Sequence, residues 1–329
     1  MPETCQRPEK QPCQDDCPAA GESKSARDNS ADLFKAGKYQ FLTGRQTFLI
    51  GILNTTPDSF SDGGLYLSRD QALFRAEEMI RQGVDIIDVG GESTRPGSED
   101  VSEHLEIERT APVVSAVVSN FDIPVSIDSY KYEVAKEAVA AGACIINDIY
   151  GLLHDPRLAA LAAQYQCGLI VMHNARYYRF ENTSHAGSHI KAAPSFMHEL
   201  KDKDLVESVL RYLNKSIETA CAAGVKPAYL LLDPGIGFGI ETAESIQLIK
   251  RLSDFRQLGR PILLGPSRKR FIGELTGTQV DHRLLGTAAA VTAGIAAGAD
   301  FVRIHDVAAM KEVVLVADAI FKNKGTIIR

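Results

Sequence analysis

The sequence predicts an α/β protein built as a single (β/α)8 barrel, and its hydrophobic pattern carries that prediction. Eight short runs of apolar or β-branched residues recur along the chain, and helical patterns separate most of them. Near-continuous apolar runs of this length are typical of strands that are buried on both faces. Repeated alternation of such strands with helices matches the architecture of this barrel.

The predicted strands begin at residue 47. In chain order they are TFLIGIL (47–53), VDIIDVG (84–90), PVSID (124–128), CIIND (144–148), GLIVMH (168–173), YLLLD (229–233), PILLG (261–265) and DFVRIH (300–305). A doubly wound open sheet is the alternative, and it usually carries a GxGxxG turn after its first strand. The segment that follows the first run here, NTTPDSFSDGG, lacks that spacing and favours the barrel.

Helical patterns occupy the segments between these runs, and several of them end on glycine, as helices often do. The predicted helices are 69–83, 102–117, 129–142, 204–224, 242–252, 281–298 and 306–322. The last two are apolar enough to predict a subunit interface in addition to a core.

Residues 1–36 predict a disordered polar extension, and residues 37–329 predict the barrel domain. The extension is rich in Pro, Gln, Ser and charge and poor in aromatic residues, which is typical of disordered chain. Its cysteines, Cys5, Cys13 and Cys17, lack the CxxC spacing of a zinc site. Six cysteines in 329 residues also do not predict a disulfide framework.

Charge and hydropathy exclude several classes of protein. The net charge of −6 argues against general nucleic-acid binding, for which a basic domain is typical. No apolar stretch reaches the length of about 18 residues that predicts a membrane-spanning helix. The first residues lack the apolar segment of a secretory signal. We therefore expect a cytoplasmic protein without a membrane or nucleic-acid partner.

Polar side chains follow nearly every predicted strand, and active sites of this barrel lie at the carboxyl ends of its strands. These residues are Asn54, Glu92, Thr94, Arg95, Asp128, Asn147, Asp148, His173, Asn174, Asp233, Ser267, Arg268, Lys269, Arg303 and His305. So many charges at one end of a barrel are costly to bury for stability alone, so they predict a binding site.

Some of these residues also have a purely structural interpretation. Asp128 could cap the next helix, because a carboxylate accepts hydrogen bonds from the first N–H groups of a helix. Asn147 and Asp148 could form turns, and His305 could be a surface histidine. Arg303 is different, because an arginine inside an apolar strand needs an anionic partner.

Six segments of the chain together resemble the dihydropteroate synthase family of folate biosynthesis. They are GILNTTPDSFSDGG, DIIDVGGESTRPGS, IINDIYG, DPGIGFG, PILLGPSRKRFIG and FVRIHDV, in family order. The resemblance implies a (β/α)8 barrel that condenses 6-hydroxymethyl-7,8-dihydropterin pyrophosphate with p-aminobenzoate. The products are 7,8-dihydropteroate and pyrophosphate, the reaction uses Mg2+, and pyrophosphate leaves first in an SN1-like path.

The resemblance also implies roles for individual residues. It implies pterin binding by Asp128, Asn147, Met172, Asp233, Gly237 and Lys269. It implies p-aminobenzoate binding by Phe60, Thr94, Arg95, Pro96, Phe238 and Ser267. It implies pyrophosphate binding by Asn54, Thr94, Arg303 and His305, with Asn54 also at the Mg2+. The residues expected to act in catalysis are Asp128, Asp233, Lys269, Arg303 and His305.

The same resemblance implies a homodimer, and sulfonamides as ligands that compete with p-aminobenzoate. Two other functions remain open from the sequence. One is a methyltransferase barrel that moves a methyl group from methyltetrahydrofolate to a corrinoid protein, and the other is a non-catalytic pterin-binding module. The residues expected to bind pyrophosphate and p-aminobenzoate argue against the methyltransferase.

Overall fold

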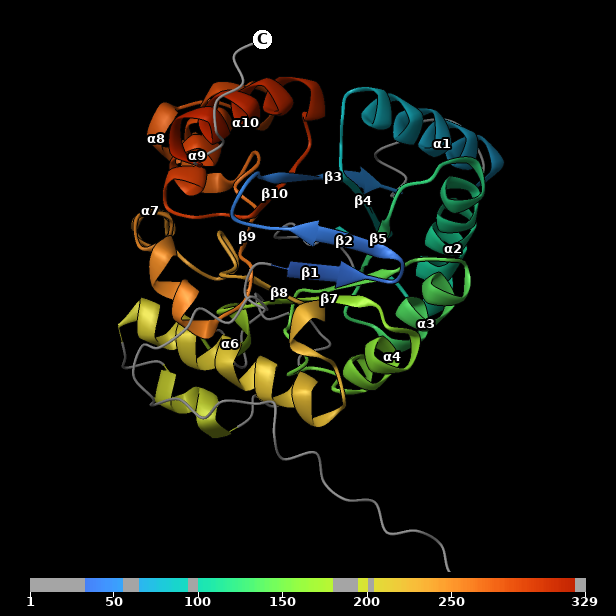
Figure 1. Ribbon diagram of the computed structural model, residues 1–329, viewed down its shortest axis with the longest axis horizontal. Coiled ribbons are helices and arrows are strands. Elements are labelled where there is room, and N and C mark those ends of the chain that lie inside the picture. Colours follow the sequence, from blue (N-terminus) through green and yellow to red (C-terminus); the bar gives the residue numbers. More distant parts are fainter. Residues whose placement is uncertain (1–32, 56–64, 94–99, 180–194, 201–203, 323–329) are drawn as a thin grey trace, which may run out of the picture.

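The computed structural model describes residues 33–55, 65–93, 100–179, 195–200 and 204–322. Within these ranges, parallel strands form one 8-stranded sheet in the order β8-β7-β6-β5-β4-β3-β10-β9. A single bridge between Leu232 and Ile262 joins the two ends of that order and closes the sheet. Helices surround it (Figure 1), so the predicted (β/α)8 barrel is confirmed.

All the predicted strands are present within a few residues of their expected bounds. The barrel strands are β3 (Phe48–Asn54), β4 (Ile86–Gly90), β5 (Val125–Asp128), β6 (Ile145–Asp148), β7 (Gly168–Met172), β8 (Leu230–Asp233), β9 (Leu263–Leu264) and β10 (Phe301–Ile304). The predicted helices correspond to α1 (Leu65–Arg81), α2 (Glu103–Asn120), α3 (Tyr132–Ala140), α6 (Leu205–Ala222), α7 (Thr242–Lys250), α9 (Leu284–Ala296) and α10 (Val307–Phe321).

Other elements were not predicted from the sequence. They are the helices α4 (Arg157–Tyr165), α5 (Arg176–Arg179) and α8 (Arg270–Thr276), and the 3-10 helices η3 (Ser195–Leu200), η4 (Pro227–Tyr229), η5 (Leu252–Leu258) and η6 (Val280–His282). Most of these are short, and short helices give a weak periodic signal.

A hairpin before the first barrel strand corrects the expected domain boundary. Strands β1 (Leu33–Ala36) and β2 (Tyr39–Leu42) pair antiparallel. Phe34 and Ala36 are fully buried, so ordered structure includes residues 33–36, which were expected to be disordered. The boundary at residue 36 was therefore placed too late, because a two-residue alternation over four residues is a weak signal. Residues 1–32, including the three cysteines of the extension, lie outside the described ranges.

The hairpin closes the amino-terminal end of the barrel with aromatic side chains. Phe34 lies edge-on to Phe301 at 5.5 Å between ring centroids, and Phe41 lies edge-on to Phe48 at 5.1 Å. Phe48 and Phe301 begin β3 and β10, so the contact is at the start of the strands. Figure 1 shows the hairpin across this end of the barrel. The opposite, carboxyl end of the strands stays uncovered by this hairpin, and active sites of this barrel lie at that end.

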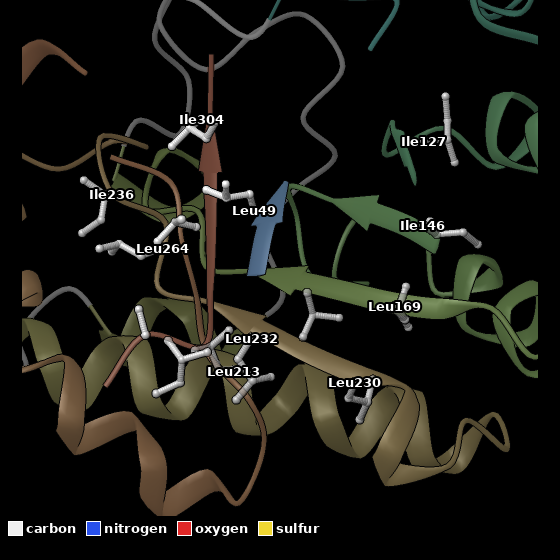
Figure 2. Packing of buried hydrophobic residues seen from close by; sticks show 14 of the residues in the cluster. Leu49, Ile127, Ile146, Leu169, Leu213, Leu230, Leu232, Ile236, Leu264 and Ile304 are labelled. Atoms are coloured by element: carbon white, nitrogen blue, oxygen red, sulfur yellow. The ribbon is translucent and has the colours of Figure 1, made fainter. Parts of the chain in front are cut away.

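Two apolar layers support the strands. Inside the barrel, side chains from successive strands form a core that continues from the hairpin, comprising Ile50, Ile86, Ile145, Ile170, Leu231 and Leu263. Outside it, a larger cluster fills the space between strands and helices. Figure 2 shows part of this cluster, with Leu230 and Leu232 of β8 on the barrel side and Leu213 on α6. The alternation of inward and outward residues follows the two-residue period of a strand.

The described residues bear on two classes that the sequence did not favour, namely membrane-spanning proteins and disulfide frameworks. None of the helices in these ranges combines the length and the apolar character that a membrane span requires. Among the described residues, Cys144, Cys167 and Cys221 form no disulfide. Burial raises the pKa of Cys144 to about 11 and that of Cys167 to about 12, so neither is activated as a nucleophile.

Candidate active site

The carboxyl ends of the strands bring together charged and polar side chains that are far apart in sequence. Parallel pairing aligns Asp128 of β5 with Asn147 of β6, and Met172 of β7 with Asp233 of β8. Arg303 projects from β10 into the same space, where it meets two carboxylates. We call the set Asp88, Asp128, Asn147, Asp233, Lys269 and Arg303 the polar layer.

Arg303 links two carboxylates across the barrel. Its Nε donates to Asp88 Oδ2 at 2.6 Å, and its Nη2 donates to Asp128 Oδ2 at 2.6 Å. Asp88 is fully buried and also accepts a hydrogen bond from Asn147 Nδ2 at 3.1 Å. Burial opposes the charge of Arg303, but Asp88 and Asp128 raise its pKa above the ordinary value. The anionic partner that the sequence demanded for Arg303 is therefore this pair.

Burial raises the pKa of both expected pterin-binding carboxyl groups. Burial raises the pKa of Asp128 to about 7, although the charge of Arg303 opposes the shift. Burial raises the pKa of Asp233 to about 6, opposed by the Gly235 N–H, which donates to Asp233 Oδ1 at 2.8 Å. Asp128 does not cap the next helix, because α3 has Lys131 at its N-cap. Its structural interpretation is thus wrong.

Lys269 lies over the face of an aromatic ring beside this layer. Its ammonium nitrogen is 4.0 Å from the centroid of the Phe238 ring, a favourable cation–π distance. Gly237 has φ +79°, and a Cβ there would lie 3.2 Å from Lys269 Cδ, so glycine leaves room for the lysine stem. Burial lowers the pKa of Lys269 to about 8, with repulsion from Arg303 acting in the same direction.

Ser267 and His305 form a pair at the ends of the adjacent strands β9 and β10. The Ser267 hydroxyl and His305 Nδ1 are 2.9 Å apart, and the His305 N–H donates to Ser267 Oγ at 3.2 Å. His305 is therefore not an isolated surface histidine. The pair joins a residue expected at p-aminobenzoate to one expected at pyrophosphate.

Comparison with known proteins places this geometry in a family. Residues 50–305 match the model of the pterin binding enzyme family. The chain is 42% identical to the dihydropteroate synthase of Synechocystis over 87% of its length and 94% of the relative's. It is 43% identical to the dihydropteroate synthase of Bacillus subtilis, over 85% of this chain and 90% of that one.

The chain belongs to the dihydropteroate synthase family. Of the three functions that the sequence left open, this assignment supports the synthase, so the chain is a transferase of folate biosynthesis.

Solved structures of dihydropteroate synthases share the fold. The Clostridium difficile enzyme, in the presence of pteroic acid, has 40% identity and a TM-score of 0.76, covering 85% of this chain and 99% of its own. The Xanthomonas albilineans enzyme with 4-aminobenzoic acid has 36% identity and a TM-score of 0.76, covering 88% and 98%. The Yersinia pestis enzyme with a sulfonamide drug has 36% identity and a TM-score of 0.75, over the same shares.

Several polar residues at the strand ends of this dihydropteroate synthase barrel serve the fold. Asp148 accepts hydrogen bonds from the N–H groups of Tyr150 and Leu152, which confirms the turn interpretation for this residue. Asn147 instead joins the polar layer. Glu92 pairs with the buried Lys131.

The cationic segment SRKR divides between the site and the fold. Arg268 has φ +57° and donates to both carboxylate oxygens of Asp306, at 3.0 Å from Nε and 2.6 Å from Nη2. Arg270 is exposed and pairs with Glu274 along α8. Lys269 is the cation of this segment that faces Phe238 and the polar layer.

Sequence reasoning missed Asp88 as a member of the site. The signal was present, because an aspartate in the otherwise apolar run VDIIDVG needs a buried partner. Within the described ranges, the buried atoms Asp88 Oδ1 and Ser126 Oγ have no hydrogen-bond partner, and their residues are paired in register. Asp88 Oδ1 can accept a hydrogen bond from a bound molecule or water, and the Ser126 hydroxyl can donate or accept one.

Two of the other expected site residues, Asn54 and Met172, lie within the described ranges. Asn54 ends β3 at the mouth, where a Cβ on Gly90 would lie 3.8 Å from Asn54 Oδ1 and 3.7 Å from Asp128 Oδ2. Met172 packs with Phe238, Tyr130 and Ile149 in a small apolar cluster. The residues expected around p-aminobenzoate in the first two loops, namely Phe60, Thr94, Arg95 and Pro96, lie outside the described ranges.

Proposed function

We propose that the polar layer binds the pterin of 6-hydroxymethyl-7,8-dihydropterin pyrophosphate and supports its condensation with p-aminobenzoate. The observation that carries the proposal is the bridge from Arg303 to Asp88 and Asp128 at the carboxyl end of the barrel. A pterin presents a flat edge of ring N–H, amino and carbonyl groups. Because each unmatched buried polar group costs about 1–3 kcal/mol, such an edge needs donors and acceptors on rigid strands.

The charges of the layer suit an SN1-like reaction. Asp88, Asp128 and Asp233 contribute three carboxyl groups, against the two cations Lys269 and Arg303. Loss of pyrophosphate leaves a cation that is delocalised from the methylene carbon into the pterin ring. Asp128 and Asp233 would stabilise that cation as it forms, which is where fixed charges have their largest effect. The proposal requires no nucleophilic side chain.

Arg303 and His305 would bind the departing pyrophosphate. Arginine has five N–H donors, and the ion pairs of Arg303 with Asp88 and Asp128 use its Nε and Nη2 groups. Within the described ranges its Nη1 group donates to no side chain or backbone oxygen, so it can serve an anion. His305 lies two residues further along the same strand end and would complete the anion site.

Asn54 would contribute a protein oxygen to Mg2+. Among the described residues, no three His, Cys, Asp or Glu side chains gather into a metal-binding group. Mg2+ usually keeps several waters and binds through one or two protein groups plus substrate phosphates, so the amide oxygen of Asn54 at the mouth fits that role. When bound, Mg2+ would neutralise charge on the pyrophosphate.

Phe238 and Ser267 would form the described part of the p-aminobenzoate site. Phe238 offers an apolar ring beside Lys269 of the polar layer, and Ser267 offers a hydroxyl beside His305. The roles of Phe60, Thr94, Arg95 and Pro96 stay predictions. Because related enzymes have been solved with 4-aminobenzoic acid and with a sulfonamide, we also propose sulfonamides as competing ligands here.

The substitution Asp128→Asn tests the proposal. It keeps the size of the side chain but removes the charge that would stabilise the pterin cation, so we expect kcat/KM to fall by about a hundredfold or more. The matched control is Asp318→Asn, which alters a buried carboxylate that accepts from Thr47 at the closed end of the barrel. The control should lower the melting temperature and keep kcat/KM. A near-wild-type kcat/KM for Asp128→Asn would refute the assigned role.

We further propose a homodimer through α8, α9 and α10. These helices expose apolar side chains, namely Leu275, Leu285, Leu315, Val316, Ile320 and Phe321. Apolar side chains gathered on one face mark interaction sites more often than scattered ones do. The cytoplasmic location and the absence of a nucleic-acid partner stay predictions.

A further inference from the structure

His173 follows β7 directly, is fully buried, and has a partner on each ring nitrogen. Its Nδ1 is 3.1 Å from the Pro234 carbonyl oxygen, and its Nε2 is 3.0 Å from the Tyr178 hydroxyl. A carbonyl oxygen can only accept, so Nδ1 carries the proton and Nε2 accepts from Tyr178. Burial lowers the pKa of His173 to about 3, so the ring is neutral at working pH.

The Pro234 carbonyl belongs to the same peptide unit as the N–H that reaches Asp233. A trans peptide unit is planar, and its C=O and N–H point in opposite directions. Here the C=O of Pro234 accepts from His173, while the N–H of Gly235 donates to Asp233 Oδ1 at 2.8 Å. The orientation of this unit therefore couples the imidazole to the carboxylate.

Backbone contacts leave this peptide unit little freedom. The His173 N–H donates to the Asp233 carbonyl at 3.0 Å. Gly235 has φ +76°, and a Cβ at that position would lie 1.8 Å from the His173 carbonyl oxygen. The end of β7 and the turn after β8 are thus in direct backbone contact, and the imidazole fixes the remaining rotation of the unit.

We propose that His173 is a positioning residue for pterin recognition, acting through the peptide unit between Pro234 and Gly235 to orient the Asp233 carboxylate. It binds no substrate atom itself. The inference rests on the proposed role of Asp233 at the pterin edge.

Two conservative substitutions separate positioning from simple packing. In His173→Asn the amide nitrogen is as many bonds from Cβ as Nδ1 is, so the donor to Pro234 can be kept. In His173→Gln the amide nitrogen matches the position of Nε2, so the donor to Pro234 is lost. His173→Phe fills the volume and removes both polar groups.

Binding of an oxidised, unreactive pterin is the readout, measured by its fluorescence at fixed pH. We expect His173→Asn to keep the wild-type Kd within a few-fold. His173→Gln and His173→Phe should raise Kd by about tenfold, as loss of one buried hydrogen bond would. If His173→Phe does not fold, the comparison of His173→Asn with His173→Gln still tests the inference. Equal Kd values for the Asn and Gln variants would overturn the inference.

The pH profile adds a readout that loss of packing would not move. Asp233 faces the Gly235 N–H, Lys269 and Arg303, all of which lower its pKa against the effect of burial. A misaligned Gly235 N–H in His173→Gln should therefore shift the weakening of pterin binding at acid pH to higher pH. An unchanged profile would contradict the inference.

Two controls locate any failure. Tyr212→Phe removes a hydroxyl that donates to the Tyr150 carbonyl at 2.8 Å, and it keeps the ring that packs edge-on against His173. It should reduce stability and leave Kd unchanged. Asp233→Asn tests the role on which the inference rests. If Asp233→Asn keeps pterin binding, the proposed role of Asp233 fails. If it loses binding while His173→Gln does not, the inference about His173 alone fails.

Discussion

At the scale of single residues, the polar layer has more carboxyl groups than cations. Asp128 accepts from Arg303 but remains buried, and its pKa is raised to about 7. A raised carboxyl pKa means that the folded protein binds this proton more tightly than the unfolded chain does. Asp128 therefore makes the folded protein less stable as pH rises from its ordinary pKa of 3.8 toward its raised pKa of about 7. Burial of Asp128 thus lowers the stability of the folded protein at a residue whose charge the proposed reaction needs.

The same shift predicts how pterin binding depends on pH. The N–H groups of a pterin need carboxylate acceptors, and protonation of Asp128 and then Asp233 removes them as pH falls. The charged groups that face Asp128 are Arg303, Asp88, Glu106 and Lys269. We expect the Kd for an oxidised pterin to rise by roughly tenfold or more between pH 8 and pH 5. Fluorescence titration across this range measures it, and a Kd independent of pH would contradict the assignment of these carboxylates.

At the scale of elements, strands such as β6, β8 and β10 do two things. Their first inward residues are apolar and complete the barrel core, and their last inward residues, Asn147, Asp233 and Arg303, are polar and face the mouth. β10 illustrates this, because Phe301 packs on the hairpin while Arg303 reaches Asp88 and Asp128. The two-residue period of a strand places both side chains on the same face. Core and site are thus parts of one continuous interior.

The outer helices carry the prediction about assembly. α9 and α10 pack against each other, and Figure 1 shows α8 beside them. Leu285 is 83% exposed and Ile320 is 65% exposed. If these side chains are buried by a second copy, Leu285→Glu or Ile320→Glu should convert the dimer to a monomer, because a charge buried in an apolar contact is unfavourable.

Light scattering measures this directly. The chain has a mass of 35.8 kDa, so the wild type should have twice that mass and the two variants should not. Phe74→Glu on α1 is the matched control, since Phe74 is 63% exposed on a helix outside the proposed interface. A wild-type mass of one chain would refute the dimer.

At the scale of the whole molecule, hydrophobic periodicity was enough to predict the barrel. The strands are short apolar runs at regular intervals, and their carboxyl-end residues could be named from position alone. The hairpin of β1 and β2 was not predicted, because its role depends on contacts with Phe48 and Phe301 that no local pattern records.

Part of the candidate site could be located from the sequence for the same reason. Asp128, Asp233 and Lys269 end or follow strands, so position indicated them. Asp88 lies two residues before Gly90, which pairs with Asp128, so Asp88 is deeper in the barrel than Asp128. Its role depends on Arg303, which is 215 residues away in the chain. His173 was visible as a polar strand end, but its link to Asp233 runs through a backbone peptide unit. Sequence patterns do not show contacts between residues that are far apart in the chain.

The measurement that tests the central claim most directly is pyrophosphate release by the purified full chain. The reaction contains 6-hydroxymethyl-7,8-dihydropterin pyrophosphate and Mg2+, with and without p-aminobenzoate. We predict release that requires p-aminobenzoate for sustained turnover and matches dihydropteroate formation one for one. Tight pterin binding without pyrophosphate release would contradict the account and would indicate a pterin-binding protein without synthase activity.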